Sequence, residues 1–180
     1  MIRKFLLAFS CAALLSACET PTTQRYAISA DNSMAIRALN ATGVGVGSFQ
    51  PPAEFSETCR ALGPLKVADN LSHTQYIQKA FQDELKVAGA FAASPRVTLN
   101  GKVTKLEFSS SRGLNGGSWT IDLALTSSNG QAMNVSEYYE FSSGFSAPEA
   151  CRQTADAFSR AVQNLVGKTV SNPQFPQMVR

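Results

Sequence analysis

The clearest pattern in the chain is an alternation of apolar and polar residues over two neighbouring runs. The apolar positions are Trp119, Ile121, Leu123 and Leu125 in the first run and Met133, Val135, Tyr139 and Phe141 in the second. A period of two is typical of strands with one buried face, and Asn129-Gly130 between the runs is a turn signal. The pattern predicts an antiparallel hairpin. Its open face would carry Thr120, Asp122, Asn134, Ser136, Tyr138 and Glu140.

Two more strands are expected earlier in the chain. In residues 42–49, Val44 and Val46 share one face and three glycines share the other, which is strand periodicity. The next strand has apolar residues at Val97, Leu99 and Val103 and, with the opposite parity, at Leu106 and Phe108. This change of parity predicts a bulge near Thr104-Lys105.

Two amphipathic helices are predicted by apolar residues that recur every three or four positions. The first begins after Ser72, which forms a capping-box pattern with Gln75, and ends at Gly89. The second begins after Ser146, which has the same pattern with Glu149. The apolar positions are Ile77, Phe81, Leu85 and Ala88 in the first helix and Ala155, Phe158, Val162 and Leu165 in the second.

Together these elements predict an α+β fold in the order β-α-β-β-β-α. We expect a two-layer sandwich, with a mostly antiparallel sheet of about four strands and both helices packed on one face. A single globular domain would span residues 26–180. Tyr26, Ile28 and Ala30 indicate a further short strand, and residues 31–40 are ambiguous between a helical turn and extended chain.

The N-terminus has the pattern of a secretion signal. Arg3 and Lys4 precede an uncharged apolar segment over residues 5–15, which is too short to span a bilayer. The run Leu15-Ser16-Ala17-Cys18 that follows resembles the lipobox of bacterial lipoproteins. That resemblance implies removal of residues 1–17 and acylation of Cys18 with chains such as palmitate. The alternative is an ordinary cleaved secretion signal.

The resemblance also implies a location. Position 19, after the lipidated cysteine, is Glu rather than Asp, which in Gram-negative lipoproteins implies delivery to the outer membrane. A polar tether over residues 18–25 would then join the lipid to a domain in the periplasm or at the exterior.

Cysteine usage follows from this location. Cys11 would leave with the signal and Cys18 would carry lipid, so that Cys59 and Cys151 remain in a compartment where disulfides persist. We expect a Cys59–Cys151 disulfide, the alternative being two free thiols. Neither belongs to a CxxC pair, which argues against thiol exchange.

Little in the chain indicates catalysis. The single histidine, His73, lies in the first turn of a predicted helix and is expected to be a surface or capping residue. Glu137 and Glu140 have opposite strand parity, so they do not form an acid–base pair. The scattered carboxylates, such as the adjacent Asp83 and Glu84, are expected to be solvent-exposed. The sequence therefore predicts neither an enzyme nor a cofactor or metal site.

Charge argues against nucleic-acid binding. The chain has 16 basic and 13 acidic residues, and without Arg3 and Lys4 the excess falls to one, with no block of like charge. A near-neutral body lacks the basic patch that nucleic acids require.

The segments IQKAFQDELKVAGAF, VTLNGKVTKLEFSS and WTIDLALTSSNG resemble those of small outer-membrane lipoproteins. That group includes the lipopolysaccharide-assembly lipoprotein and the auxiliary lipoproteins of lipid-transport ABC systems. The resemblance covers residues 44–170 and implies an accessory subunit of a larger envelope transport or assembly complex. The alternative is a module that binds a lipid or glycan. We expect a partner protein to dock on the open sheet face at Tyr138 or on the glycine-rich tip over residues 109–118, unless both are simply solvated.

Overall fold

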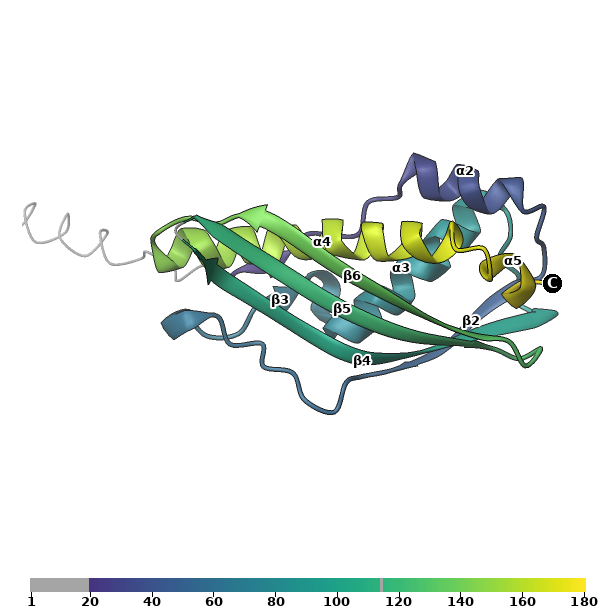
Figure 1. The fold of residues 1–180 in the computed structure, drawn as a ribbon, viewed down its shortest axis with the longest axis horizontal. Coiled ribbons are helices and arrows are strands. Elements are labelled where there is room, and N and C mark those ends of the chain that lie inside the picture. The colour runs from purple at the N-terminus through teal and green to yellow at the C-terminus, as the bar shows by residue number, and fades with distance from the viewer. Residues whose placement is uncertain (1–19, 114) are drawn as a thin grey trace, which may run out of the picture.

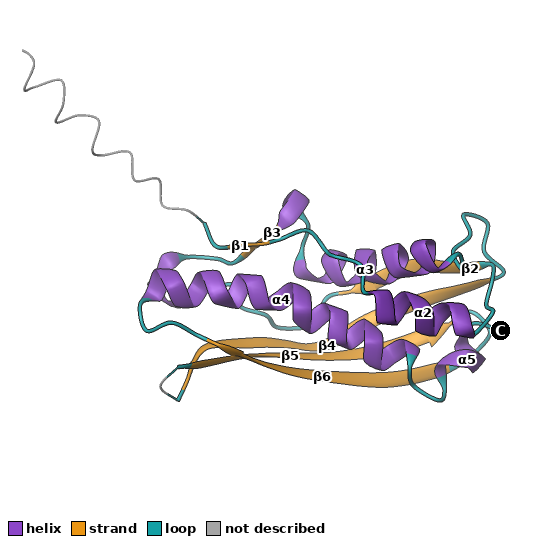
Figure 2. Cartoon of the chain, turned by 90° about the horizontal axis from the view of Figure 1, so that it is seen from above, coloured by secondary structure: helices purple, strands orange, loops and turns teal. Residues whose placement is uncertain are grey.

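The computed structural model describes residues 20–113 and 115–180, and its centre is a four-stranded sheet in the order β2-β4-β5-β6. The strands are β2 (Val44–Gln50), β4 (Val97–Arg112), β5 (Gly116–Ser127) and β6 (Ala132–Ser142). The two long helices, α3 (His73–Ala88) and α4 (Ala147–Val170), lie along one side of the sheet (Figure 1, Figure 2). The predicted α+β sandwich of one sheet and covering helices is therefore confirmed.

The sheet is mostly antiparallel, as predicted, but it is mixed because one pair of strands is parallel. β4, β5 and β6 pair antiparallel, but β2 pairs with β4 in parallel. The reason is the connection between them, since α3 separates β2 from β4 and returns the chain to the end of the sheet where β2 began. A strand–helix–strand unit of this kind produces parallel pairing.

The hairpin follows its predicted register. The apolar residues of β5 are fully buried: Trp119, Ile121, Leu123 and Leu125. Met133 and Val135, on the neighbouring strand β6, are buried as well. Tyr139 and Phe141 share their face but are only half-buried. The predicted bulge is confirmed, because the β4–β5 register shifts between Val103 and Lys105.

Of the two predicted capping boxes, the structure forms one. The Ser72 hydroxyl accepts from Gln75 N, while Gln75 Oε1 accepts from Ser72 N, which is a complete capping box. Ser146 is the N-cap of α4, but its side chain makes no cap hydrogen bond, so the second capping box is wrong. The Glu149 carboxylate instead accepts from the side chains of Arg152 and Gln153 one turn further on.

The N-terminal part of the domain differs from expectation. Thr22–Thr23 forms β1, which pairs in parallel with β3 (Lys66–Val67), while the strand predicted at Tyr26–Ala30 is absent from this stretch. The ambiguous segment is helix α2 (Ala30–Ala38), capped by Ser29. Pro21 is already buried, so residues 21–25 belong to the folded body and the predicted tether is shorter. Cys18 and the signal segment lie outside the described residues.

Three short elements complete the chain: η2 (Arg60–Leu62), η3 (Ala68–Asn70) and α5 (Phe175–Met178). The tip expected over residues 109–118 is also smaller than predicted, since β4 continues to Arg112 and β5 begins at Gly116. Its backbone is mostly paired strand rather than loop.

Candidate functional site

The predicted disulfide forms between the loop after β2 and the start of α4. The Cα atoms of Cys59 and Cys151 are 5.9 Å apart, and their sulfur atoms are bonded. Both residues are fully buried. The bond therefore holds η2 and the following loop against the first turns of α4.

Tyr138 lies on the open face of the sheet, as its parity predicted, and 48% of it is exposed. Its neighbours come from β4 and from β6 itself. The Arg112 guanidinium lies over the Tyr138 ring at 5.2 Å from the centroid, and it forms an ion pair with Glu140. The Tyr138 hydroxyl is 3.5 Å from the same carboxylate. The arrangement is a small aromatic and charged patch on an otherwise polar face.

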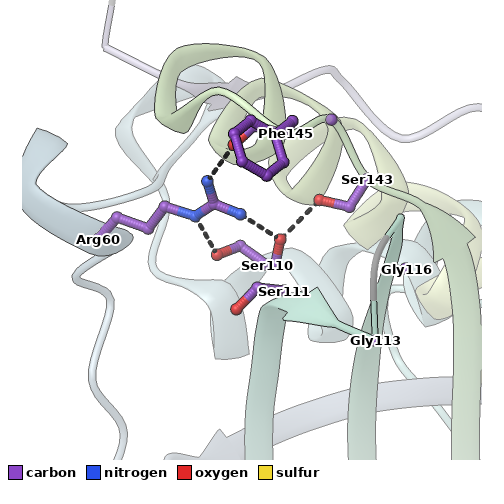
Figure 3. A pocket seen from close by; sticks show the side chains of 8 residues that line it. Arg60, Ser110, Ser111, Gly113, Gly116, Ser143 and Phe145 are labelled. Atoms are coloured by element: carbon purple, nitrogen blue, oxygen red, sulfur yellow. Dashed lines mark hydrogen bonds between the residues drawn. The ribbon is translucent and has the colours of Figure 1, made fainter.

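A hollow of about 260 Å³ lies at the tip end of the sheet (Figure 3). Arg60 extends across it and donates from Nε to Ser110 Oγ at 3.0 Å, from Nη2 to the Ser110 carbonyl at 2.8 Å and from Nη1 to the Phe145 carbonyl at 3.1 Å. Ser143 Oγ donates to the same Ser110 carbonyl at 2.6 Å. All three nitrogen atoms of the guanidinium donate hydrogen bonds to protein oxygens. Arg60 therefore acts as a clamp between η2, β4 and the β6–α4 loop.

A second hollow, of about 550 Å³, lies between the loop after β2 and the N-terminal end of α3. One wall is apolar and the other is polar. The lining residues are Phe49, Pro51, Pro52, Ala53 and Phe55 on the apolar side and Glu57, Ser72, His73, Thr74 and Gln75 on the polar side. We call this the His73 hollow.

His73 is buried, which corrects the prediction of a surface or capping residue. Only 3% of it is exposed, and its ring lies 4.9 Å from the ring centroids of both Phe55 and Phe158. Trp119 lies slightly further away, at 5.9 Å. The first turn of α3 points toward the core because His73 lies four positions before Ile77 on the helix, on the apolar stripe.

The electrostatics of His73 are set by two opposing influences. Burial lowers the pKa of His73 below its ordinary value, and Lys66 acts in the same direction, while the Glu57 carboxylate raises it. Glu57 Oε1 lies 3.3 Å from His73 Nδ1. Within the described residues, neither ring nitrogen has a hydrogen-bond partner of good geometry. His73 is thus a buried polar group with unused hydrogen-bonding capacity beside a hollow, and its burial favours the neutral form.

Two buried carboxylates were missed by the sequence interpretation, which assigned such groups to solvation. Glu84 is fully buried on α3, and Glu137 is buried on β6, where its Oε2 lies 2.7 Å from Lys168 Nζ. A signal existed for both. Glu84 lies three positions after Phe81, on the apolar stripe, and Glu137 has the parity of Val135 and Tyr139.

The described residues contain no group of three or more His, Cys, Asp or Glu side chains arranged to hold a metal ion. Over residues 20–113 and 115–180, no helix is both long and apolar enough to cross a bilayer.

Comparison with known proteins adds little. No protein-family model and no curated protein matches the chain. Among solved structures it is similar to a protein of Caulobacter crescentus CB15 described as a "putative lipoprotein". That similarity has 11% sequence identity and a TM-score of 0.45, and it covers 78% of this chain and 90% of the other. Because a similarity of this size supports no functional conclusion, function has to be argued from the residues.

Proposed function

We propose that this protein is a non-enzymatic, lipid-anchored protein of the bacterial outer membrane that serves as an accessory subunit of a larger envelope complex. The observation that carries the proposal is the disulfide between Cys59 and Cys151 behind a lipobox-like run that ends at Cys18. Buried disulfides are stable in the oxidising envelope and rare in the cytosol. The lipid attached at Cys18 would hold the domain at the membrane.

The domain offers a partner protein the open face of its sheet. Tyr138 is exposed there, together with the Arg112–Glu140 ion pair, and aromatic and arginine side chains are enriched where proteins bind one another. The covered face is filled by α3 and α4, and the polar groups of Arg60, Glu84 and Glu137 are engaged within the protein. A binding role therefore suits the exposed residues better than a catalytic one.

Mass spectrometry of the mature N-terminus tests the anchor. We expect Cys18 to be the first residue and to carry acyl chains, and we expect the protein to fractionate with the outer membrane. A Cys18→Ser variant should be released from the membrane. An unmodified Cys18, or a Cys18→Ser protein that stays membrane-bound, would contradict the proposal. Crosslinking in cells would then identify the partner.

The His73 hollow favours a second candidate function, the binding of a small amphipathic molecule such as a lipid. Its apolar wall suits an acyl chain, and His73, in the first turn of α3, has ring nitrogens without a hydrogen-bond partner among the described residues. Organic extraction of the purified protein, followed by mass spectrometry, tests this role. A lipid recovered from the wild type and lost in a Phe55→Asp variant would support it. A variant at Met34, far from the hollow, is the control. Equal recovery of lipid from this control and from Phe55→Asp would contradict the lipid-binding role.

A further inference from the structure

We infer that one end of the domain rests on the membrane and inserts Phe145 into the lipid interface. This end, here called the anchor end, consists of η2 (Arg60–Leu62) and the β6–α4 loop (residues 143–146). The inference rests on the proposed lipidation of Cys18 and adds an orientation to it. It depends on three features: the path of the N-terminal segment, the short distance from Cys18 to the folded body, and the side chains exposed at this end.

The N-terminal segment runs alongside α4 and in the same direction. Thr23 Oγ1 donates to the Ala155 carbonyl at 2.9 Å, and four residues later the Ala27 carbonyl accepts from Gln163 Nε2. An extended chain covers about 13 Å in four residues, and a helix covers about 12 Å in eight. The two paths therefore match in length, and going back from Thr23 leads toward the start of α4.

The length of the chain limits how far a lipid on Cys18 can lie from the folded body. Pro21 is buried and its carbonyl accepts from Lys66 N at 2.8 Å, so the packed body begins there. Cys18 precedes Pro21 by three residues, which span at most about 11 Å. From Ala155 back to Ala147, α4 covers about 12 Å, and Phe145 is two residues beyond. A lipid on Cys18 is therefore within reach of this end of the domain and not of the opposite one.

The figures show toward which end of the domain the described N-terminal segment leads. Both views show β1 beside the first half of α4, at the same end of the molecule as the β4–β5 tip (Figure 1, Figure 2). The opposite end holds α2 and α5. A short link to the lipid forces the nearer end of the domain, rather than the farther one, against the bilayer.

The side chains exposed at the anchor end suit a lipid surface. Phe145 is 92% exposed, more than any other large hydrophobic side chain in the described residues, and Leu62 is 45% exposed. Arg60 fixes the position of Phe145 by donating to its carbonyl. Phenylalanine and leucine side chains are typical of protein surfaces that insert into the membrane interface. With a lipid on Cys18, a bilayer at the anchor end would give the exposed Phe145 ring an apolar environment.

A fluorescence experiment on the full mature lipoprotein tests the inference. With Cys18 acylated and Cys59 bonded to Cys151, a Phe145→Cys variant has a single free thiol, which can carry an environment-sensitive NBD dye. The protein is reconstituted into vesicles of phosphatidylethanolamine and phosphatidylglycerol, with or without nitroxide-labelled acyl chains. Met34→Cys is the matched control, because Met34 is also exposed, at 60%, but lies on α2.

We expect the dye at position 145 to be blue-shifted and quenched by the lipid nitroxide several-fold more than the dye at position 34. Equal, weak quenching at both positions would overturn the inference. Flotation of the same vesicles separates this result from the proposed function. Protein that floats with equal quenching is anchored but not oriented as inferred, whereas protein that fails to float contradicts both the anchor and the orientation.

Discussion

The hydroxyl of Tyr26 donates a 2.8 Å hydrogen bond to the carboxylate of Glu84, which joins the N-terminal segment to α3 inside the protein. The same carboxylate accepts from Ser29 N at 2.8 Å and from Ser33 Oγ at 2.9 Å, with Asn32 Nδ2 at 3.4 Å. Burial, reinforced by Glu84, raises the pKa of Tyr26, so the phenol keeps the proton that it donates. A buried charge is tolerated only when it is hydrogen-bonded in this way.

Replacing Glu84 should loosen α2. Glu84→Gln removes one of the two acceptor oxygens that share the donors of the N-terminal segment and α2, so we expect the free energy of unfolding to fall by about 1–3 kcal/mol. Urea denaturation followed by circular dichroism measures this change. The adjacent Asp83→Asn is the control, because Asp83 forms only a surface ion pair with Lys79 and should cost about 0.5 kcal/mol or less. Equal costs for the two variants would refute a special role for Glu84.

The disulfide should contribute strongly to stability. Its partners are 92 residues apart in sequence, and closing a loop of this length stabilises a fold by about 4–5 kcal/mol in the chain-entropy model. We expect the Cys59→Ala/Cys151→Ala protein to unfold at a much lower urea concentration than the oxidised wild type. Reduced wild type serves as the comparison and should resemble the double variant. No difference between oxidised and reduced protein would show that the bond contributes nothing.

His73 should titrate below its ordinary pKa of 6.5, because burial disfavours its charged form. Since it is the chain's only histidine, its imidazole NMR signals can be assigned without ambiguity. The unfolded chain binds a proton near pH 6.5 while the folded protein does not. Stability from this group is therefore complete above pH 6.5 and falls as the pH drops toward the folded pKa. A His73 signal that titrates at or above 6.5 would contradict this.

Glu57 provides a second test of the same site. Its carboxylate, 3.3 Å from His73 Nδ1, raises the His73 pKa against the effect of burial. Glu57→Gln should therefore lower that pKa further, as measured by the same NMR titration. Glu54→Gln, an exposed residue on the same loop, is the control and should leave the His73 pKa unchanged. A rise in Glu57→Gln would mean that the carboxylate does not face the imidazole in solution.

Tyr138 and Tyr139 are neighbours on β6 that should respond oppositely to truncation. Tyr138→Ala removes an exposed ring, so we expect folding to be intact and crosslinking to the envelope partner to weaken. Tyr139→Ala removes a half-buried ring on the helix-covered face and should cost about 1–3 kcal/mol in stability. Thermal denaturation and crosslinking yield distinguish the two effects. Loss of fold in Tyr138→Ala, or an unchanged crosslink, would move the docking surface elsewhere.

Local patterns in the sequence were sufficient for the main elements. The alternation around Trp119 and Leu123 determined the β5–β6 hairpin and its buried face, and the change of parity at Leu106 determined the bulge in β4. The stripe at Phe81 and the box at Ser72 determined α3. These features were predictable because strand and helix periods depend on residues only a few positions apart.

The disulfide was also predictable, though for a chemical rather than a structural reason. Once Cys11 and Cys18 are assigned to the signal and the lipid, Cys59 and Cys151 are the remaining pair, and the structure bonds them. Their geometry, with the loop after β2 held against α4, came only from the folded chain.

The tertiary structure decided what lies beneath the N-terminal segment and the loop after β2. Glu84 is buried because Tyr26 and the first turn of α2 fold over it, and His73 because Phe55 and Phe158 close around it. β2 runs parallel to β4 because α3 crosses between them. Each of these outcomes depends on contacts between segments far apart in sequence. Helix and strand periodicity predicts only which face of an element is covered. It does not predict which distant segment covers that face.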